Sequence, residues 1–378
     1  MEAKKIPSVS VFRFLIHSTQ ILKNPLPFHH KNFQTKGDTF RLKLGFGNSV
    51  IFSRDAGFAQ YALQKNQRNF TKSPIQLIQP AFHKKQLVNL LATVQNAIKV
   101  ELAKIETEKP IDIFPIFNDL AFQTVVKSLF SSAIDVQEIK KLQHITESAQ
   151  QMLVRELRQP YLGWWFRLSG KIKKHLCETE QARIILKKLI NQRKESGKRE
   201  DDLLDMLLEA RYEDGSEMEE KQLIDEILIL FTAGHETTSN ALTFTCELLA
   251  RNVQIQEKLF SEIIEAEKNS ETLMDFIKNC PFTKNVIEES LRLYPPAYFI
   301  DRVNIEEDEF NGMKIPKNSN LLFSLLEIHT NPKYWDEPQK FKPERIKTYK
   351  ISEKKKPVQI KPLITLKPKN AILEFNFR

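Results

Sequence analysis

Most of the chain has the hydrophobic period of α-helices. Between residues 84 and 330, apolar residues recur three and four positions apart, as they do in residues 87–98 and 218–230. This spacing is typical of helices that bury one face. We therefore predict a mainly helical body over residues 84–330.

The two ends of the chain have β patterns instead. Residues 38–53 alternate apolar and polar side chains around a glycine-containing turn, and residues 358–377 contain two β-rich runs around a Pro-Lys-Asn turn. Each pattern predicts a hairpin. Because no internal repeat or linker-like segment interrupts the sequence, we predict one domain over residues 1–378. Its expected fold class is mainly α with small β-sheets contributed by both ends.

The composition is that of a folded protein, and its positive charge is concentrated in one segment. Hydrophobic residues make up 41% of the 378 residues and charged residues 28%, which excludes a disordered or collagen-like chain. The net charge is +9, and residues 347–378 alone hold nine Lys and Arg against two acids, so a nucleic-acid-binding body is not indicated. No apolar run is long enough to cross a bilayer and no secretion signal is recognisable, so we expect a cytoplasmic protein without a membrane span.

The most informative motif is a polar cluster inside an apolar helical pattern. Residues 224–240 read IDEILILFTAGHETTSN, in which the polar run from Gly234 to Thr238 interrupts the apolar spacing. Glycine and consecutive threonines are poor helix formers, and polar groups inside an apolar helix are costly. Two interpretations stay open. The helix bends or opens here and presents polar groups to a cavity, or it forms a kink in which its hydroxyl groups are capped and satisfied.

His235 and Glu236 also begin the zinc-protease motif HExxH. The second histidine of that motif would have to be residue 239, which is Ser239. The motif is therefore incomplete, and a zinc protease is excluded on that residue.

A second constellation combines one acid with two arginines. Glu289 and Arg292 are three residues apart, so they share one face of a helix that two prolines then end. Arg345 lies in the rigid segment 335–346, and one carboxylate can accept two guanidinium groups. We predict a network of these three side chains. The alternative, for each taken alone, is a solvated surface residue.

Taken together, these segments resemble the cytochrome P-450 family of haem-thiolate monooxygenases. Residues 233–238 (AGHETT) are similar to the family's central-helix motif, residues 289–292 (ESLR) to its ExxR motif and residues 343–346 (PERI) to its PERF motif, in the family's order. Residues 364–375 resemble its closing hairpin. The resemblance covers essentially the whole chain and implies the fold of that family.

The resemblance also implies the reactants. The cofactor would be haem b with its iron, and the substrates O2 and an apolar small molecule. Electrons would come from a separate ferredoxin, flavodoxin or reductase. Thr237 would match the threonine that stabilises bound oxygen, and Glu236 the acid of the proton-delivery route.

Further residues take roles from the same resemblance. Ala233 and Gly234 would lie close to the haem face, and Arg302 would match the strand arginine that reaches a haem propionate. The network predicted above would be structural and lie on the proximal side of the haem. Four residues are candidates for the substrate cavity, with ordinary core packing as the alternative for each: Phe231, Tyr298, Phe299 and Ile300.

The chain departs from the family in two places. The cysteine loop FxxGxRxCxG is expected directly after residues 343–346, but the sequence continues KTYKISEKKKP. A helix with the motif WxxxR, whose basic residue pairs with a haem propionate, is missing near residue 76. Cys177, Cys246 and Cys280 lack the surrounding motif, so no metal ligand is predicted. We expect the fold to be incomplete on the proximal haem side.

Two functions follow from this combination. The first is a haem-dependent monooxygenase that inserts one oxygen atom from O2 into an apolar substrate. The second is a catalytically inactive, haem-free remnant of such an enzyme. A further arrangement is a haem held by histidine, for which His83, His235 and His329 are conceivable ligands.

Overall fold

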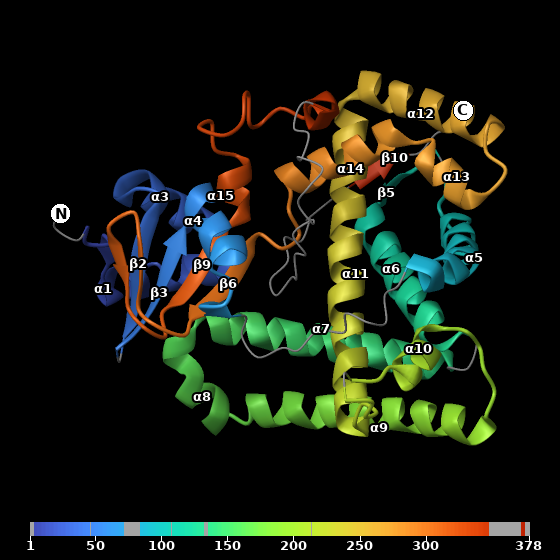
Figure 1. Ribbon diagram of the computed structural model, residues 1–378, viewed down its shortest axis with the longest axis horizontal. Helices are drawn as coiled ribbons and strands as arrows, with labels where there is room; N and C mark the ends of the chain where they lie inside the picture. Colours follow the sequence, from blue (N-terminus) through green and yellow to red (C-terminus); the bar gives the residue numbers. More distant parts are fainter. Residues whose placement is uncertain are drawn as a thin grey trace.

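The chain forms a six-stranded sheet with short helices and, beside it, a larger group of long helices (Figure 1). In Figure 1 the sheet lies on the left, and α11 (Glu220–Arg251), the longest helix, stands in the middle of the helical part. This computed structural model describes residues 4–45, 47–71, 84–106, 108–131, 135–212, 214–347 and 372–374.

The large sheet has the strand order β1-β2-β3-β9-β6-β4. β2 (Thr39–Gly45) and β3 (Asn48–Ser53) form an antiparallel pair with Phe40 opposite Phe52, which confirms the hairpin predicted over residues 38–53. β3 continues the sheet by parallel pairing with β9 (Asn320–Ser324), so segments far apart in sequence lie side by side. The other strands are β1 (Ser8–Val9), β4 (Phe70–Thr71) and β6 (Phe299–Asn304), and β7 (Asp308–Phe310) and β8 (Met313–Ile315) form a separate pair.

The predicted second hairpin falls mostly outside the described residues. Within residues 358–377, β10 (Ile372–Glu374) is described, and it pairs antiparallel with β5 (Pro110–Asp112). This pair lies in the helical part, because β5 leads directly into α6 (Ile113–Phe130). The rest of that prediction lies outside the described residues.

The helical body predicted for residues 84–330 is confirmed as far as Leu293, the end of α14. Beyond it the expectation is wrong, because residues 299–324 form the strands β6 to β9. These strands pair with the amino-terminal hairpin or with each other, and local hydrophobic spacing does not report such distant partners.

The helices of the larger part are α5 (Lys84–Leu102), α6 (Ile113–Phe130), α7 (Val136–Arg158), α8 (Gly163–Leu168), α9 (Lys171–Ser196), α10 (Leu203–Glu209), α11 (Glu220–Arg251), α12 (Val253–Lys268), α13 (Leu273–Lys278) and α14 (Pro281–Leu293). The helices beside the sheet are α1 (Val11–Ile16), α2 (Ser18–Lys23), α3 (Leu26–Lys36), α4 (Ala56–Gln60) and α15 (Leu325–His329). Single turns are η1 (Tyr61–Lys65), η2 (Pro160–Leu162) and η3 (Pro343–Lys347).

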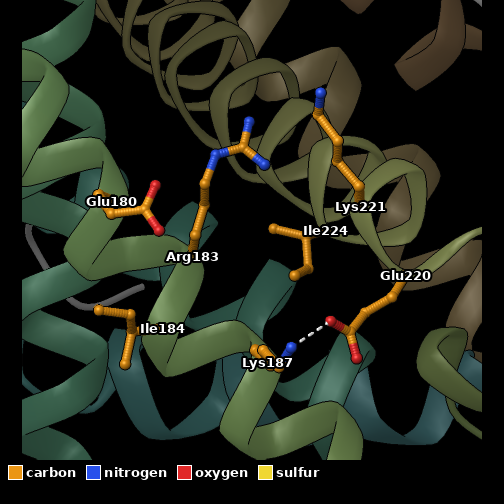
Figure 2. A pocket seen from close by; sticks show the side chains of 7 residues that line it. All are labelled: Glu180, Arg183, Ile184, Lys187, Glu220, Lys221 and Ile224. Atoms are coloured by element: carbon orange, nitrogen blue, oxygen red, sulfur yellow. Dashed lines mark ion pairs between the residues drawn. The ribbon is translucent and has the colours of Figure 1, made fainter.

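A surface pocket of about 450 Å³ lies where α9 crosses the first turns of α11 (Figure 2). Lys187 of α9 and Glu220 of α11 form an ion pair across it at 2.7 Å. The lining residues are Glu180, Arg183, Ile184, Lys187, Glu220, Lys221 and Ile224. Ile224 is twelve residues before Glu236, which is about 18 Å along a helix axis, so this charged pocket is separate from the polar cluster of α11.

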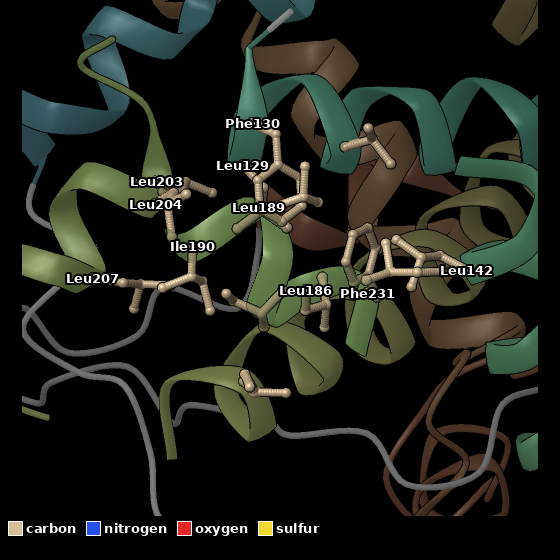
Figure 3. Close-up of a cluster of buried hydrophobic side chains, with 14 of the residues drawn as sticks. Leu129, Phe130, Leu142, Leu186, Leu189, Ile190, Leu203, Leu204, Leu207 and Phe231 are labelled. Atoms are coloured by element: carbon tan, nitrogen blue, oxygen red, sulfur yellow. The ribbon is translucent and has the colours of Figure 1, made fainter. Parts of the chain in front are cut away.

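The main hydrophobic core lies between α6, α7, α9, α10 and α11 (Figure 3). Phe130 of α6, Leu186 of α9 and Phe231 of α11 are each at most 1% exposed. Burying a side chain of this size contributes about 1.5–3 kcal/mol, so this cluster fixes the positions of the five helices around α11. A second core, with Phe33, Phe40 and Phe52, lies between the sheet and α3.

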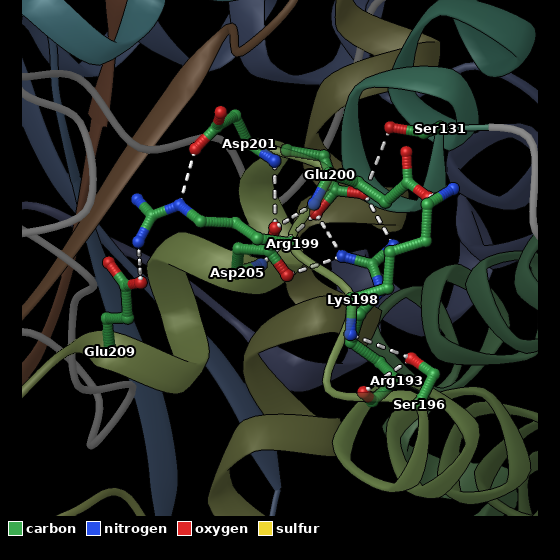
Figure 4. Close-up of polar contacts among 10 residues, drawn as sticks. Ser131, Arg193, Ser196, Lys198, Arg199, Glu200, Asp201, Asp205 and Glu209 are labelled. Atoms are coloured by element: carbon green, nitrogen blue, oxygen red, sulfur yellow. Dashed lines mark hydrogen bonds and ion pairs between the residues drawn. The ribbon is translucent and has the colours of Figure 1, made fainter.

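A buried ion cluster holds the end of α9 against α10 (Figure 4). The Arg193 guanidinium donates to both carboxylate oxygens of Asp202 at 2.9 and 2.7 Å and also to Asp205. Asp202 accepts a further bond from the Ser131 hydroxyl at 3.1 Å. The hydrogen bonds that Arg193 donates to Asp202 raise the pKa of Arg193, against the opposing effect of burial. Each charged group in the cluster therefore has hydrogen-bonded partners, although the cluster has two carboxylates for one guanidinium, and such partners lower the cost of burying a charge.

We expect Arg193→Met to lower the free energy of unfolding by about 3–5 kcal/mol, because it leaves two buried carboxylates without their cation. Urea denaturation measures this difference. The matched control is Arg199→Met, since Arg199 pairs with Asp201 and Glu209 on the exposed surface and its loss should leave the midpoint nearly unchanged. Equal shifts for the two variants would contradict the prediction.

Candidate functional site

The polar cluster lies inside an uninterrupted helix. α11 runs from Glu220 to Arg251 through residues 233–238 without a break. The Thr237 hydroxyl donates to the Ala233 carbonyl at 2.6 Å, and His235 Nδ1 lies 2.6 Å from the Phe231 carbonyl. The same bond to a carbonyl three or four residues earlier is made by Ser239, Thr243 and Thr245. The hydroxyl groups are therefore satisfied within the helix, as the second interpretation expects, and the helical hydrogen bonding does not open at this point.

One face of α11 nevertheless carries polar groups. At about 100° per residue, Ala233, Glu236, Thr237 and Asn240 fall within one third of the helix circumference. Asn240 is 0% exposed, and neither its amide nitrogen nor its amide oxygen has a hydrogen-bond partner among the described residues. A buried amide without a partner is costly, so it indicates a missing polar neighbour on this face. Sequence reasoning missed Asn240, because its burial and its lack of a partner are visible only in the structure.

Gly234 packs closely against α6. A Cβ atom at Gly234 would lie 2.9 Å from a methyl group of Val125 in α6. Val125 is β-branched and has little rotamer freedom, so a larger residue would force α6 and α11 apart. The small size of Gly234 is thus explained by helix packing, whereas the resemblance attributes it to a haem face.

The four candidate substrate residues have the contacts of ordinary core packing. Phe231 is 0% exposed and stacks on Phe122 of α6 with ring centroids 5.6 Å apart. Phe299 meets the Phe52 ring edge-on at 5.5 Å. The other two, Tyr298 and Ile300, are also buried, and burial raises the pKa of the Tyr298 hydroxyl.

Arg302 is a half-buried cation without an acidic partner. It lies on β6 opposite Leu321 of β9, and its guanidinium donates to the Asp301 carbonyl at 2.6 Å. In the described part of the chain no carboxylate lies within ion-pair distance of it, and the charge of the adjacent Asp301 acts on it only as the weaker effect on its pKa. Burial lowers the pKa of Arg302 below its ordinary value. An acidic ligand group beside this strand would offset that cost.

Glu289, Arg292 and Arg345 are in direct contact. Arg292 donates to both oxygens of the Glu289 carboxylate at 2.8 and 2.9 Å, and Arg345 donates to one of them at 2.9 Å. The backbone N–H of Lys342 adds a fourth bond at 3.0 Å. The Glu289 and Arg292 side chains are 0% and 3% exposed, so the alternative of a solvated ion pair is wrong.

The same arginines hold an irregular segment of backbone. Arg292 donates to the carbonyls of His329 at 2.7 Å, Pro338 at 2.8 Å and Lys340 at 3.2 Å. Its guanidinium carbon also lies 4.9 Å from the centre of the Trp335 ring. The network therefore fixes residues 329–345, which have few backbone bonds of their own, against α14.

The described residues contain neither a candidate metal site nor a candidate membrane span. No three His, Cys, Asp or Glu side chains in those ranges gather into a metal site. Among the helices of the described chain, none is long and apolar enough to cross a membrane.

Comparison with known families gives a result that agrees with this geometry. The family model described as cytochrome P-450 matches residues 54–362, which is most of the chain. The chain belongs to the cytochrome P-450 family. The fold class predicted from the sequence, mainly α with small β-sheets, is thereby confirmed.

Similar proteins come from several groups of organisms. Cyclooctat-9-en-7-ol 5-monooxygenase of Streptomyces melanosporofaciens is 28% identical over 329 residues, covering 86% of this chain and 67% of that protein. Pentalenene oxygenase of Streptomyces avermitilis is 23% identical, with 87% and 78% covered. The chain spans 55% of cytochrome P-450 CYP72A219 of Panax ginseng, at 27% identity over 71% of this chain.

Solved structures of the family have the same fold. Retinoic-acid-bound cyanobacterial CYP120A1 superposes with a TM-score of 0.74 at 25% identity, covering 88% of this chain and 79% of that one. The haem domain of another cytochrome P-450 gives a TM-score of 0.77 at 16% identity, over 91% and 82% of the two chains.

The cysteines of this chain do not fit the family's cofactor. Cytochromes P-450 hold haem iron with a cysteine thiolate. Cys177 is exposed on α9, Cys246 lies within α11, and Cys280 directly precedes α14. Burial raises the pKa of Cys246 to about 11 and also raises that of Cys280, so both favour the protonated thiol. No cysteine is present between residues 343–346 and residues 364–375, the segments that resemble the PERF motif and the closing hairpin.

His235 and His329 are also poorly placed to bind a haem iron. The His235 ring is 1% exposed, bonded to the helix backbone and edge-on to Phe122 at 5.2 Å. His329 lies against Trp335 within the network, with a buried Nδ1 that has no partner among the described residues. His83 lies outside the described residues. The donor groups in the described chain thus disagree with the cofactor that the family implies.

We expect Glu289→Gln to lower the free energy of unfolding by about 3–5 kcal/mol, because two buried guanidinium groups would lose their counter-ion. Glu247→Gln is the matched control. Glu247 pairs with the exposed Arg251 one turn away on α11, so its loss should cost less than about 1 kcal/mol. Chemical denaturation compares the two. If Glu289→Gln were as stable as the control, Glu289 would not hold this segment.

The network also predicts sensitivity to acid. Burial, with a smaller effect of the Arg292 charge, lowers the pKa of His329 to about 4. In the unfolded chain its pKa is about 6.5, so the unfolded state binds the proton first and stability falls as the pH decreases from 6.5 towards 4. At pH 5 the loss should be roughly 2 kcal/mol.

His329→Gln should remove this part of the pH dependence, measured as the unfolding free energy at pH 7 and pH 5. His29, whose pKa burial lowers to about 3, contributes a similar dependence that the variant leaves in place. His144→Gln, on an exposed position of α7, is the control and should retain the full difference. An unchanged difference in the His329 variant would contradict the prediction.

Proposed function

We propose that this chain has the scaffold of a cytochrome P-450 monooxygenase for apolar organic substrates, and that the polypeptide as its sequence stands does not carry out the reaction. The family's reaction inserts one oxygen atom from O2 into the substrate, with electrons from a separate ferredoxin, flavodoxin or reductase. The observation that carries the proposal is that a complete Glu289–Arg292–Arg345 network is followed by no cysteine.

The substrate class is supported by the names of similar proteins. Two of them are named for reactions on cyclooctat-9-en-7-ol and pentalenene, both of which are largely hydrocarbon, and a third has retinoic acid bound. We propose that the substrate pocket of this scaffold is suited to molecules of the same apolar character.

The inactivity follows from the chemistry of the iron ligand. A thiolate donates electron density to haem iron and favours cleavage of the O–O bond. In this chain the two buried thiols have raised pKa values and lie in α11 and beside α14, and the third is on the outer surface of α9. Without a thiolate at the proximal side, we propose a haem-free, inactive protein.

Two groups support the view that a segment is missing rather than replaced. Asn240 has a buried amide without a partner, and Arg302 has no carboxylate partner, both within the described chain. A protein that had adapted to the loss would be expected to pair or replace such groups, because each unpaired buried polar group costs about 1–3 kcal/mol.

The test is a carbon monoxide spectrum. The purified chain is incubated with haem, reduced and exposed to CO, and we expect no band of the thiolate-ligated type. In a second protein, the family's cysteine-loop segment is inserted after Ile346, and we expect the thiolate-type band to appear. The matched control carries the same insertion with its cysteine replaced by serine.

The outcomes separate the two halves of the proposal. A thiolate-type band from the unmodified chain would refute the inactivity. A folded insertion variant that takes up no haem would refute the claim that the remaining scaffold is that of a monooxygenase.

A further inference from the structure

The surface pocket between α9 and α11 combines a charged rim with apolar side chains (Figure 2). Its volume of about 450 Å³ lies within the range of roughly 300–1,000 Å³ that is typical of small-molecule sites. Ile184 of α9 is 61% exposed in this pocket, and Ile224 of α11 is 5% exposed. The two isoleucines give the pocket an apolar surface that a ligand of suitable shape can cover.

Two ion pairs join the walls of the pocket. The Arg183 guanidinium of α9 pairs with Asp225 of α11. One turn further along α9, the Lys187 ammonium pairs with Glu220 of α11 at 2.7 Å. These four charges are compensated within the protein, so a ligand does not need to displace any of them. Because both pairs connect α9 with α11, the walls are already in place before a ligand binds.

Two other charged residues of the rim have no counter-ion in the described chain. Glu180 of α9 and Lys221 of α11 line opposite walls of the pocket, both are exposed, and neither forms an ion pair with a described residue. In Figure 2 Arg183 lies between them, and the Lys221 side chain extends to the same edge of the pocket as the Arg183 guanidinium. The pocket therefore offers a separate acid and a separate cation beside its apolar surface.

The Arg183 guanidinium can also donate to a ligand. It bonds to Asp225 through Nη2, and its Nε–H and Nη1–H groups have no acceptor among the described residues. A carboxylate at this edge of the pocket can accept from Arg183 and Lys221 together, and hydrogen bonds between charged groups are stronger than those between neutral ones.

We infer that this pocket binds a small zwitterion with an apolar body, such as a dipeptide with aliphatic side chains. The ammonium group of the ligand pairs with Glu180. Its carboxylate binds Lys221 and Arg183, and its aliphatic side chains cover Ile184 and Ile224. A simple anion is disfavoured because Glu180 repels it, and a simple cation is disfavoured because Lys221 repels it.

The inference does not depend on the proposed function, since the pocket is separate from the polar cluster of α11. The complete chain is therefore tested without added haem. A ligand that binds the folded chain, and not the unfolded one, stabilises it, so a bound dipeptide should also raise the temperature of unfolding.

The experiment is a nuclear magnetic resonance titration of the isotope-labelled chain with related dipeptides. Leucyl-leucine should shift amide signals of α9 and α11. N-acetyl-leucyl-leucine lacks the ammonium group and leucyl-leucinamide lacks the carboxylate, and each should bind about two- to fivefold more weakly. Glycyl-glycine has the same charges without the aliphatic side chains and should bind at least about tenfold more weakly.

Two variants assign the ends of the ligand. Glu180→Gln should weaken the binding of leucyl-leucine about two- to fivefold and leave that of the N-acetyl compound unchanged. Lys221→Gln should weaken the binding of leucyl-leucine by a similar factor and leave that of the amide unchanged. The matched controls are Glu195→Gln and Lys194→Gln, because these exposed residues of α9 do not line the pocket, and both should bind like the original chain.

Three results would overturn the inference. The first is an absence of signal changes on α9 and α11 at leucyl-leucine concentrations up to about 10 mM. The second is binding of either blocked dipeptide that is as tight as that of leucyl-leucine, which would leave a site for a simple ion. The third is an equal effect of the pocket variants and the controls. Urea midpoints verify that each variant is folded.

Discussion

The arrangement of this molecule depends on one buried carboxylate. Glu289 has no exposed surface and is compensated by two guanidinium groups and a backbone N–H. Burying such a charge is unfavourable unless every partner is in place, so the positions of α14, η3 and the irregular segment between them are determined together. Arg292 extends this constraint to three carbonyls of a segment that has little regular structure to hold it. Packing of α14 on α11 then connects the network to the helical core.

The sequence predicted those parts of the fold that depend on local spacing. The amino-terminal hairpin and the helices up to Leu293 follow from periods of two and of three to four residues. The strands from Phe299 to Ser324 could not be found in this way, because their pairing is with residues near the start of the chain. The continuity of α11 was also not predictable from propensity alone. Its threonines and serine bond to the helix backbone, and packing on α6 and α9 outweighs the unfavourable glycine.

Some residues of the candidate site could be predicted from the sequence and others could not. The spacing of Glu289 and Arg292 and the composition of the segment around Arg345 allowed a network of charged residues but left a solvated alternative open, and the family resemblance favoured the network. The roles of small and apolar residues could not be predicted in this way, because they depend on which side chains of other elements pack against them. Gly234 is small because Val125 of α6 approaches it, and Phe231 belongs to the helical core. Asn240 was missed because an asparagine in a helix becomes informative only when it is buried and unpaired.

The hydrogen bonds of the Glu289 network end within the chain itself. Every oxygen of Glu289 is bonded to a protein group, so the network does not need a bound cofactor to be satisfied. The buried Asn240 amide on α11, in contrast, has no hydrogen-bond partner among the described residues, and Arg302 on β6 donates to the Asp301 carbonyl but forms no ion pair within the described chain. The strongest buried interactions of the chain are therefore complete without any further group, whereas the Asn240 amide carries the cost of an unpaired polar group. The residues that hold this part of the fold, Glu289, Arg292 and Arg345, are thus different from the polar residues on the face of α11.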